Sequence, residues 1–152
     1  MPPTAAEPDN DLSACRRRQK RLLAVMERLD LDLIVVTQIE HVQYLAGPRF
    51  KWVFAPSAAL DRQGQLTLVA PASAVQEAAA DRVVTYEAQW HSTLRNDQRQ
   101  ASSAALLAAL AGHKPARIGC EFSSISRHIT DTLEAKWIDI EPELYQLRRR
   151  KD

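Results

Sequence analysis

Histidine is the side chain best suited to metal binding and proton transfer near neutral pH, and this sequence has four: His41, His91, His113 and His128. A metal site needs three or more donors that converge, often with two of them one helical turn apart or on one strand. None of the four has another histidine at such a spacing. His128 and Asp131 are three residues apart, a spacing typical of a surface pair on a helix. We therefore expect no metal ligands and no catalytic residues in this chain.

Motifs for nucleotide binding and for a nucleophilic serine are missing from the sequence. Its four glycines form neither GxGxxG nor GxxxxGKS, and GxSxG does not occur. Asp30 and Asp32 flank the start of a predicted strand, but acid–base work would need a cleft that the sequence does not reveal. Cys15 and Cys120 form no CxxC pair, and we interpret them as reduced thiols of a cytoplasmic protein.

The segment from Arg49 to Trp52 (RFKW) places two aromatic and two cationic side chains in a predicted loop. Such a loop suits recognition of a carboxylate or of a protein partner. Alternatively, Phe50 and Trp52 fold back over the neighbouring hairpin as part of the core. Both interpretations stay open. A second basic run, Arg16 to Arg21, is interpreted as a solvated helix face rather than an anion-binding stripe.

The positions of these residues depend on an alternation of predicted helices and strands. Helical spacing of leucines and caps predict helices over residues 11–30, 38–47, 71–80 and 97–111, from Ser123 or Ser124 through Ala135, and from Pro142 onward. Apolar and alternating runs predict strands over residues 31–36, 53–60, 65–70, 82–87, 117–121 and 137–140, with a hairpin around the turn 61–64. Residues 88–96 form an ambiguous connection. This order predicts an α/β domain with a mixed β-sheet flanked by helices.

Length and composition are those of one soluble globular domain. The 152 residues are 45% hydrophobic and 26% charged, with a formal net charge of +1. So balanced a charge gives no general attraction for nucleic acid or an anionic membrane, and no apolar run approaches the roughly 20 residues of a membrane helix. Residues 1–10 have the composition of a disordered tail and not of a secretory signal. We therefore expect a cytoplasmic protein that binds neither nucleic acid nor membrane.

Five segments follow one another in an informative order: RRQKRLLAVMERLDLDLIVV, HVQYLAG, LTLVAP, RIGCE and LYQLRRRKD. Tyr44 to Gly47 (YLAG) is similar to a YLTG-type segment, and Leu147 to Lys151 (LRRRK) is similar to an LRxxK motif. Together these segments span nearly the whole chain from about Ser13. The chain resembles the N-terminal domain of the creatinase, prolidase and Xaa-Pro aminopeptidase family, the pita-bread metallopeptidases and their relatives.

The resemblance implies a ribonuclease H-like α/β domain over residues 11–152 that carries no chemistry of its own. In that family a later pita-bread domain holds two divalent metal ions (Mn, Zn or Co) with two Asp, one His and two Glu, and a creatinase-like enzyme uses none. The resemblance therefore implies that the catalytic domain is absent from this chain, that it is the expected partner, and that this chain holds no cofactor.

The resemblance also implies a homodimer in which the loop after Gly47 lines the entrance to the active site of the other subunit. Arg49, Phe50 and Trp52 are the candidates for this entrance, and His41 is a weaker one. A guanidinium can bind a carboxylate through two hydrogen bonds, and an aromatic side chain can enclose an apolar ring. The alternative is a stand-alone module that binds a small ligand or a protein and has no enzymatic parent.

Overall fold

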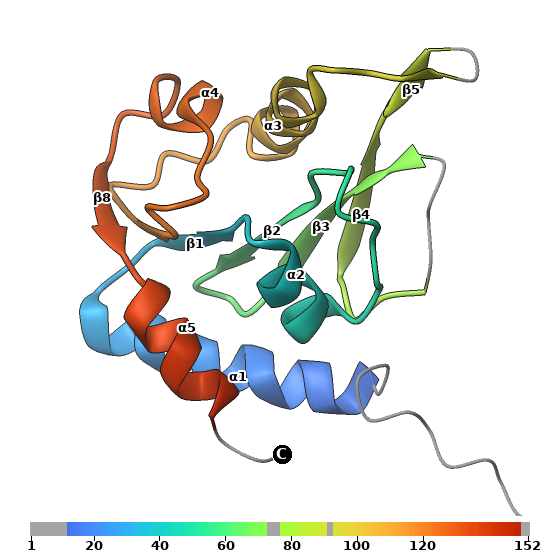
Figure 1. Cartoon of the computed structure of the whole chain (residues 1–152). Coiled ribbons are helices and arrows are strands. Elements are labelled where there is room, and N and C mark those ends of the chain that lie inside the picture. The colour runs from blue at the N-terminus through green and yellow to red at the C-terminus, as the bar shows by residue number, and fades with distance from the viewer. Residues whose placement is uncertain (1–11, 73–76, 91–92, 150–152) are drawn as a thin grey trace, which may run out of the picture.

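A six-stranded mixed sheet runs through the middle of the molecule, with helices on both faces (Figure 1). The computed structural model describes residues 12–72, 77–90 and 93–149. The helices are α1 (Leu12–Leu29), α2 (Ile39–Ala46), α3 (Gln98–Ala109), α4 (Arg127–Thr130) and α5 (Glu141–Arg148). The strands are β1 (Leu33–Val36), β2 (Ser57–Asp61), β3 (Leu66–Pro71), β4 (Arg82–Tyr86), β5 (Gln89–Trp90), β6 (Thr93–Leu94), β7 (Arg117–Cys120) and β8 (Lys136–Asp139). The predicted mixed sheet flanked by helices is thereby confirmed, while the predicted tail at residues 1–10 lies outside the described residues.

The strands of this sheet lie in the order β4-β3-β2-β1-β7-β8. The pairs β1–β2 and β2–β3 are antiparallel, and the other three pairs are parallel. β1 therefore lies inside the sheet, and all four of its residues are buried, as the apolar run predicts. Apart from this sheet, β5 and β6 form a small antiparallel hairpin within the connection that the sequence left ambiguous.

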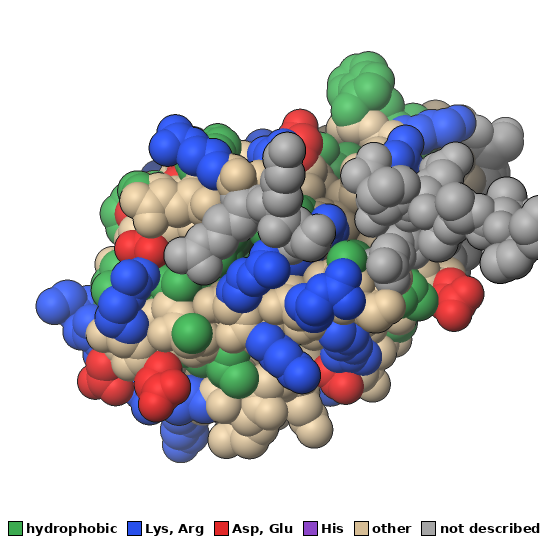
Figure 2. Space-filling model, turned by 90° about the horizontal axis from the view of Figure 1, so that it is seen from below, with side chains coloured by type: hydrophobic (Ala, Val, Ile, Leu, Met, Phe, Trp, Pro, Cys, Tyr) green, Lys and Arg blue, Asp and Glu red, His purple; other side chains and the backbone are tan. Residues whose placement is uncertain are grey.

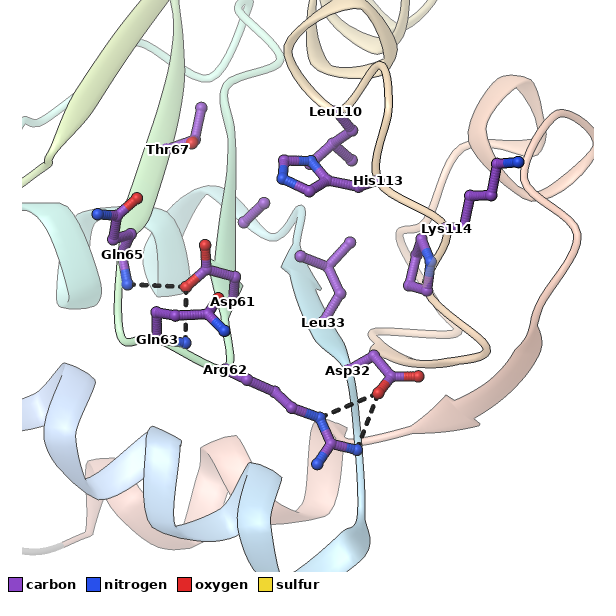
Figure 3. A pocket seen from close by; sticks show the side chains of 12 residues that line it. Asp32, Leu33, Asp61, Arg62, Gln63, Gln65, Thr67, Leu110, His113 and Lys114 are labelled. Carbon is purple, nitrogen blue, oxygen red and sulfur yellow. Dashed lines mark hydrogen bonds and ion pairs between the residues drawn. The ribbon is translucent and has the colours of Figure 1, made fainter.

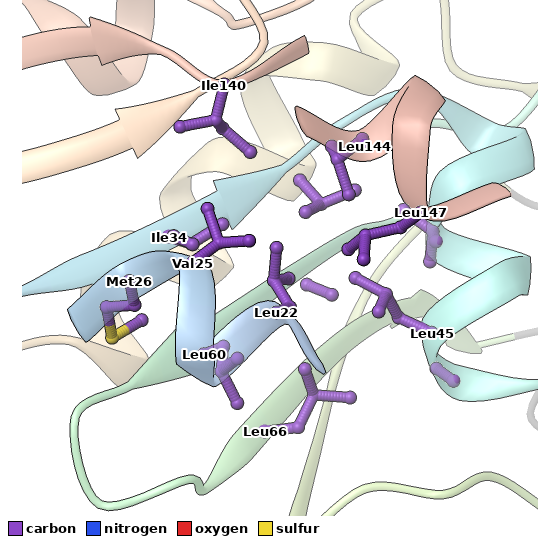
Figure 4. Close-up of a cluster of buried hydrophobic side chains, with 14 of the residues drawn as sticks. Leu22, Val25, Met26, Ile34, Leu45, Leu60, Leu66, Ile140, Leu144 and Leu147 are labelled. Carbon is purple, nitrogen blue, oxygen red and sulfur yellow. The ribbon is translucent and has the colours of Figure 1, made fainter. Parts of the chain in front are cut away.

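The sheet separates two hydrophobic cores. On one face, α1, α2 and α5 enclose a cluster that includes Leu22, Met26, Ile34, Leu45, Leu60 and Leu144 (Figure 4). On the other face, α3 and α4 enclose a cluster that includes Leu33, Val35, Leu106, Ile118 and Ile129. Successive side chains of a strand point to opposite faces, so β1 contributes Ile34 and Val36 to the first core and Leu33 and Val35 to the second.

Two glycines stand where the backbone has no room for a side chain. Gly47 ends α2 with a φ of 107°, and its N–H donates to the carbonyl of Gln43 over 2.8 Å. A Cβ at Gly47 would lie 2.9 Å from Cδ2 of Leu12. A Cβ at Gly119 in β7 would lie 2.8 Å from Cδ1 of Leu31 and 2.9 Å from Cγ2 of Ile140. A larger residue at either position would displace packed neighbours.

The predicted helix over residues 71–80 is wrong at Pro71 and at residues 77–80. Pro71 ends β3, because this strand continues until Pro71 lies opposite Tyr86 of β4. Residues 77–80 are not helical, and Ala79 instead donates its N–H to Ala46 O over 2.8 Å and accepts from Gln19 Nε2 over 2.7 Å. Long-range hydrogen bonds therefore override the helix propensity of this alanine-rich segment.

The predicted helix from Ser123 or Ser124 to Ala135 is reduced to the single turn of α4. Its N-cap is Ser126, whose hydroxyl accepts from His128 N over 3.1 Å. Ser123 instead donates both its N–H and its hydroxyl to Oε1 of Glu141, each over 2.6 Å. Ser124 instead donates its N–H to Glu121 O in a turn after β7.

Candidate functional site

The loop between α2 and β2 carries three of the four residues predicted for a substrate entrance. Phe50 is partly buried and packs against the core formed by α1, α2 and α5, whereas Phe54 packs against the opposite core. Trp52 lies between these two anchors and is 86% exposed, and Arg49 is also exposed. Phe50 therefore covers the core, while Trp52 faces solvent and its part in recognition stays a prediction.

A broad surface groove of about 560 Å³ adjoins Trp52. Trp52, Val53, Leu94 and His128 contribute to its lining, together with the segment 95–100. Arg95 lies 4.6 Å above the ring of Trp90 and donates to both carboxylate oxygens of Asp97, over 2.8 and 2.9 Å. These hydrogen bonds hold the pKa of Asp97 below its ordinary value. One part of the groove is thus lined by exposed apolar side chains, and another part by Arg95 and Asp97, which pair with each other.

His41, the fourth candidate, is fully buried and does not line this groove. Its Nδ1 lies 2.5 Å from Oε2 of Glu121, and Arg148 donates from Nη1 to its Nε2 over 3.3 Å. A guanidinium has no acceptor, so Nε2 is the unprotonated nitrogen and Nδ1–H donates to Glu121. The ring of Tyr145 packs edge-on against His41 at 5.2 Å. His41 therefore connects α2 to the end of β7 and to α5, and its part in a substrate entrance stays a prediction.

Glu121 follows β7 directly and carries the other half of this buried pair. Its Oε1 accepts from the backbone N–H of Thr37 over 2.9 Å and of Gln38 over 3.0 Å. Because β1 and β7 are parallel, their carboxyl ends meet at one edge of the sheet and bring residues 37 and 121 together. The sequence does not predict this contact, because nothing in RIGCE (residues 117–121) indicates that its glutamate is a buried hydrogen-bond acceptor.

A second pocket, of about 280 Å³, lies at the opposite end of β1 (Figure 3). Asp32, the turn residue Arg62 and the side chain of His113 contribute to its lining. Arg62 donates to Asp32 and to Asp30, each over 2.9 Å, and the backbone N–H groups of Arg117 and Ala116 also donate to Asp32. Chiefly these backbone hydrogen bonds lower the pKa of Asp32. The two aspartates are therefore joined to Arg62 and fix the β2–β3 turn to the start of β1.

The basic run of α1 lies on the face that Figure 2 shows, where Lys and Arg side chains gather. Cations of α1 contact neighbouring elements: Arg16 lies 3.1 Å from Asp81, and Arg28, which follows the basic run, donates to Glu143 of α5 over 2.6 Å. Arg18 lies 4.4 Å above the ring of Tyr44. Within the part of the chain that the structure describes, no helix has the length and apolarity to cross a bilayer.

Metal-ligating side chains do not gather in the described part of the chain. Residues 12–72, 77–90 and 93–149 contain no group of three or more His, Cys, Asp or Glu side chains placed to hold a metal ion. His91, one of the four histidines, lies outside these residues. Burial, reinforced by Asp139, raises the pKa of the Cys120 thiol to about 12. Cys120 therefore stays protonated at neutral pH and is a poor nucleophile.

Comparison with known proteins places this geometry in a family. Residues 18–150 match the family model of the creatinase/prolidase N-terminal domain. The structure resembles that of a proline dipeptidase from Streptococcus pneumoniae with a TM-score of 0.65 and 18% identity, over 88% of this chain and 98% of that one. No curated protein sequence matches the chain.

Two longer solved structures contain the same fold as one part. A dipeptidase, PepE, from Mycobacterium ulcerans is 24% identical with a TM-score of 0.62, over 93% of this chain but 38% of that one. A prolidase from Pyrococcus horikoshii is 15% identical with a TM-score of 0.64, over 90% of this chain and 36% of that one. This chain therefore spans little more than a third of these longer proteins. With the family model matched over nearly all described residues, the chain belongs to the creatinase/prolidase N-terminal domain family.

Proposed function

We propose that this chain serves as the non-catalytic N-terminal domain of a cytoplasmic Xaa-Pro dipeptidase, aminopeptidase or creatinase-like hydrolase. It would help the enzyme to form a homodimer and would present the loop around Trp52 at the entrance to the active site of the other subunit. The reaction itself would belong to a C-terminal pita-bread domain, with two divalent metal ions (Mn, Zn or Co) there in a peptidase and none in a creatinase-like enzyme. Family membership supports this division of labour.

The exposure of Trp52 is the observation that carries the proposed entrance role. A tryptophan that is 86% exposed gains little from folding, yet Phe50 and Phe54 anchor its loop to both cores. The loop is thus held in place while its largest apolar side chain is left for a partner. Arg49 beside it would supply a cation for a substrate carboxylate.

Hydrolysis by the purified chain tests the division of labour. The chain is incubated with Ala-Pro and Mn²⁺, Zn²⁺ or Co²⁺, and release of proline is measured. We expect no turnover above the buffer control. Clear turnover that follows the chain through purification would contradict the proposal.

Sedimentation of the same protein tests the assembly role. We expect a concentration-dependent dimer that Trp52→Ala weakens and that Phe122→Ala, a change at another exposed aromatic residue, leaves intact. A chain that stays monomeric at all concentrations, or a dimer indifferent to Trp52→Ala, would favour the stand-alone binding module instead. An open reading frame that stops naturally after codon 152 would favour the same alternative.

A further inference from the structure

A small pocket lined by hydroxyl groups lies behind the Trp52 loop, between the sheet and the helices α3 and α4. Its volume is about 30 Å³. Six of its lining residues carry a hydroxyl group: Thr37, Ser57, Ser102, Ser103, Ser124 and Ser126. They come from the carboxyl end of β1, the start of β2, one turn of α3 and the segment before α4. Four separate segments thus direct the same functional group to one place.

One of these hydroxyl groups, that of Ser57, has no hydrogen-bond partner among the described residues. Ser57 Oγ is completely buried and unpaired, and the residue is 3% exposed. Ser102 and Ser103 are 4% and 3% exposed on the buried side of α3. By contrast, Thr37 and Ser124 pair with each other over 2.7 Å. Because a completely buried hydroxyl without a partner is costly, Ser57 Oγ indicates that something else binds at this place.

The charges around the pocket favour a ligand with negative charge. Arg99, one helical turn before Ser102 and Ser103, lines the pocket and has no partner among the described residues. Two acids that lie near these residues along the chain already have donors, since Asp97 accepts from Arg95 and Glu121 accepts from three donors. These two carboxylates therefore already have donors of their own, whereas the guanidinium of Arg99 lines the pocket.

The size of the pocket selects among oxyanions. A space of 30 Å³ accommodates one or two groups of about the size of a water molecule. Two such groups match the oxygens of a carboxylate, while a phosphate presents more oxygens than the pocket holds. Arg99 also lines the Trp52 groove, so the remainder of a bound acid would extend toward an apolar wall.

We propose that this hydroxyl pocket binds the carboxylate of a small organic acid or peptide, with Ser57, Ser102 and Ser103 donating to its oxygens and Arg99 balancing its charge. All of these residues belong to the chain itself. The proposal therefore goes beyond the function proposed above and does not depend on it, because the isolated chain would bind the ligand whether or not it forms a dimer.

Titration of the purified chain with four probes tests the site. N-acetyl-L-proline, N-acetyl-L-prolinamide, sodium acetate and inorganic phosphate are compared by calorimetry and by NMR shifts of the serine amides. We expect N-acetyl-L-proline to bind about tenfold more tightly than its uncharged amide, and acetate more tightly than phosphate. Equal binding of acid and amide, tighter binding of phosphate, or no binding by either carboxylate would overturn the proposal.

Arg99→Gln is expected to weaken N-acetyl-L-proline binding about tenfold. Arg17→Gln is the matched control, because Arg17 is an exposed arginine on α1, across the sheet from the pocket. Equal losses in both variants would show general attraction to a basic surface and would refute the site.

Ser57→Ala separates a ligand from ordered water. If the pocket binds a carboxylate, the variant loses affinity for N-acetyl-L-proline while the free protein melts at an unchanged or higher temperature, since an unpaired hydroxyl has been removed. A variant that melts at a lower temperature and keeps its affinity would show that Ser57 binds a structural water, which would refute its assigned role.

Discussion

The side chain of Glu121 connects the end of β7 to the end of β1 and to α2. Replacing it by glutamine tests how much its negative charge contributes to the free energy of unfolding. The side chain is fully buried and accepts from Thr37 N, Gln38 N and His41 Nδ1. Glu121→Gln keeps the shape and one acceptor oxygen but turns an N–H₂ donor toward His41. His41 cannot compensate by moving its proton to Nε2, because that nitrogen accepts from Arg148, which can only donate.

The magnitude follows from the contacts that the substitution alters. Hydrogen bonds to charged groups contribute about 1.5–3 kcal/mol, and the substitution removes the one from His41 and weakens the other two. Two backbone bonds survive with a neutral acceptor, so we expect the free energy of unfolding to fall by about 3 kcal/mol. A domain of this size loses about 2–4 °C of melting temperature per kcal/mol, which gives a decrease of roughly 6–12 °C.

Thermal and urea denaturation followed by circular dichroism measure this loss. Glu27→Gln is the control, since Glu27 is exposed on α1 and its substitution should change the unfolding free energy by less than about 0.5 kcal/mol. His41→Gln and the double variant complete a cycle whose effects should not add. Melting of Glu121→Gln within about 2 °C of the wild type, or additive effects in the cycle, would refute the network as described.

Three further predictions concern the core, the loop and the turn. Ile34→Asp should leave no soluble folded protein, because an unpaired charge in a fully buried strand costs several kcal/mol; well-folded variant protein by NMR would contradict the role of β1. Trp52→Ala should melt within about 2 °C of the wild type, whereas Phe50→Ala should melt lower because Phe50 packs on the core; the reverse order by calorimetry would contradict the loop description. Because hydrogen bonds lower the pKa of Asp32 in the folded state, its contribution is present above the unfolded pKa of about 4 and is lost as pH falls through the folded pKa. Asp32→Asn should therefore lose less melting temperature than the wild type between about pH 5 and pH 2, and parallel losses would argue against this linkage.

The sheet could be predicted from the sequence because its strands are locally distinctive. The run at residues 31–36 is apolar on both faces, as a central strand must be, and the polar turn at 61–64 separates two apolar runs. Helix propensity gives a wrong prediction where tertiary hydrogen bonds hold the backbone, as at Ala79, and where a serine that resembles a cap binds Glu141 instead. Local preferences cannot anticipate such distant partners.

The surroundings of the candidate residues were harder to predict than the residues themselves. Phe50 and Trp52 are two positions apart, and only the packed structure shows that one is anchored and the other exposed. His41 and Glu121 are 80 residues apart, and Ser57 and Ser102 come from different elements. Contacts of this kind arise from topology, which composition and spacing do not encode.

The alternation of β1 between the two cores has a consequence for local opening of the molecule. The four residues of β1 pack against both cores, so loss of packing on either face of the sheet destabilises the same strand. The helices on one face therefore cannot separate from the sheet without lowering the stability of the other face. Amide hydrogens of β1, β2 and β7 should therefore exchange with deuterium only through global opening, at one common free energy. In the small β5–β6 hairpin, by contrast, Trp90, Thr93 and Leu94 are exposed, and its amides should exchange far sooner.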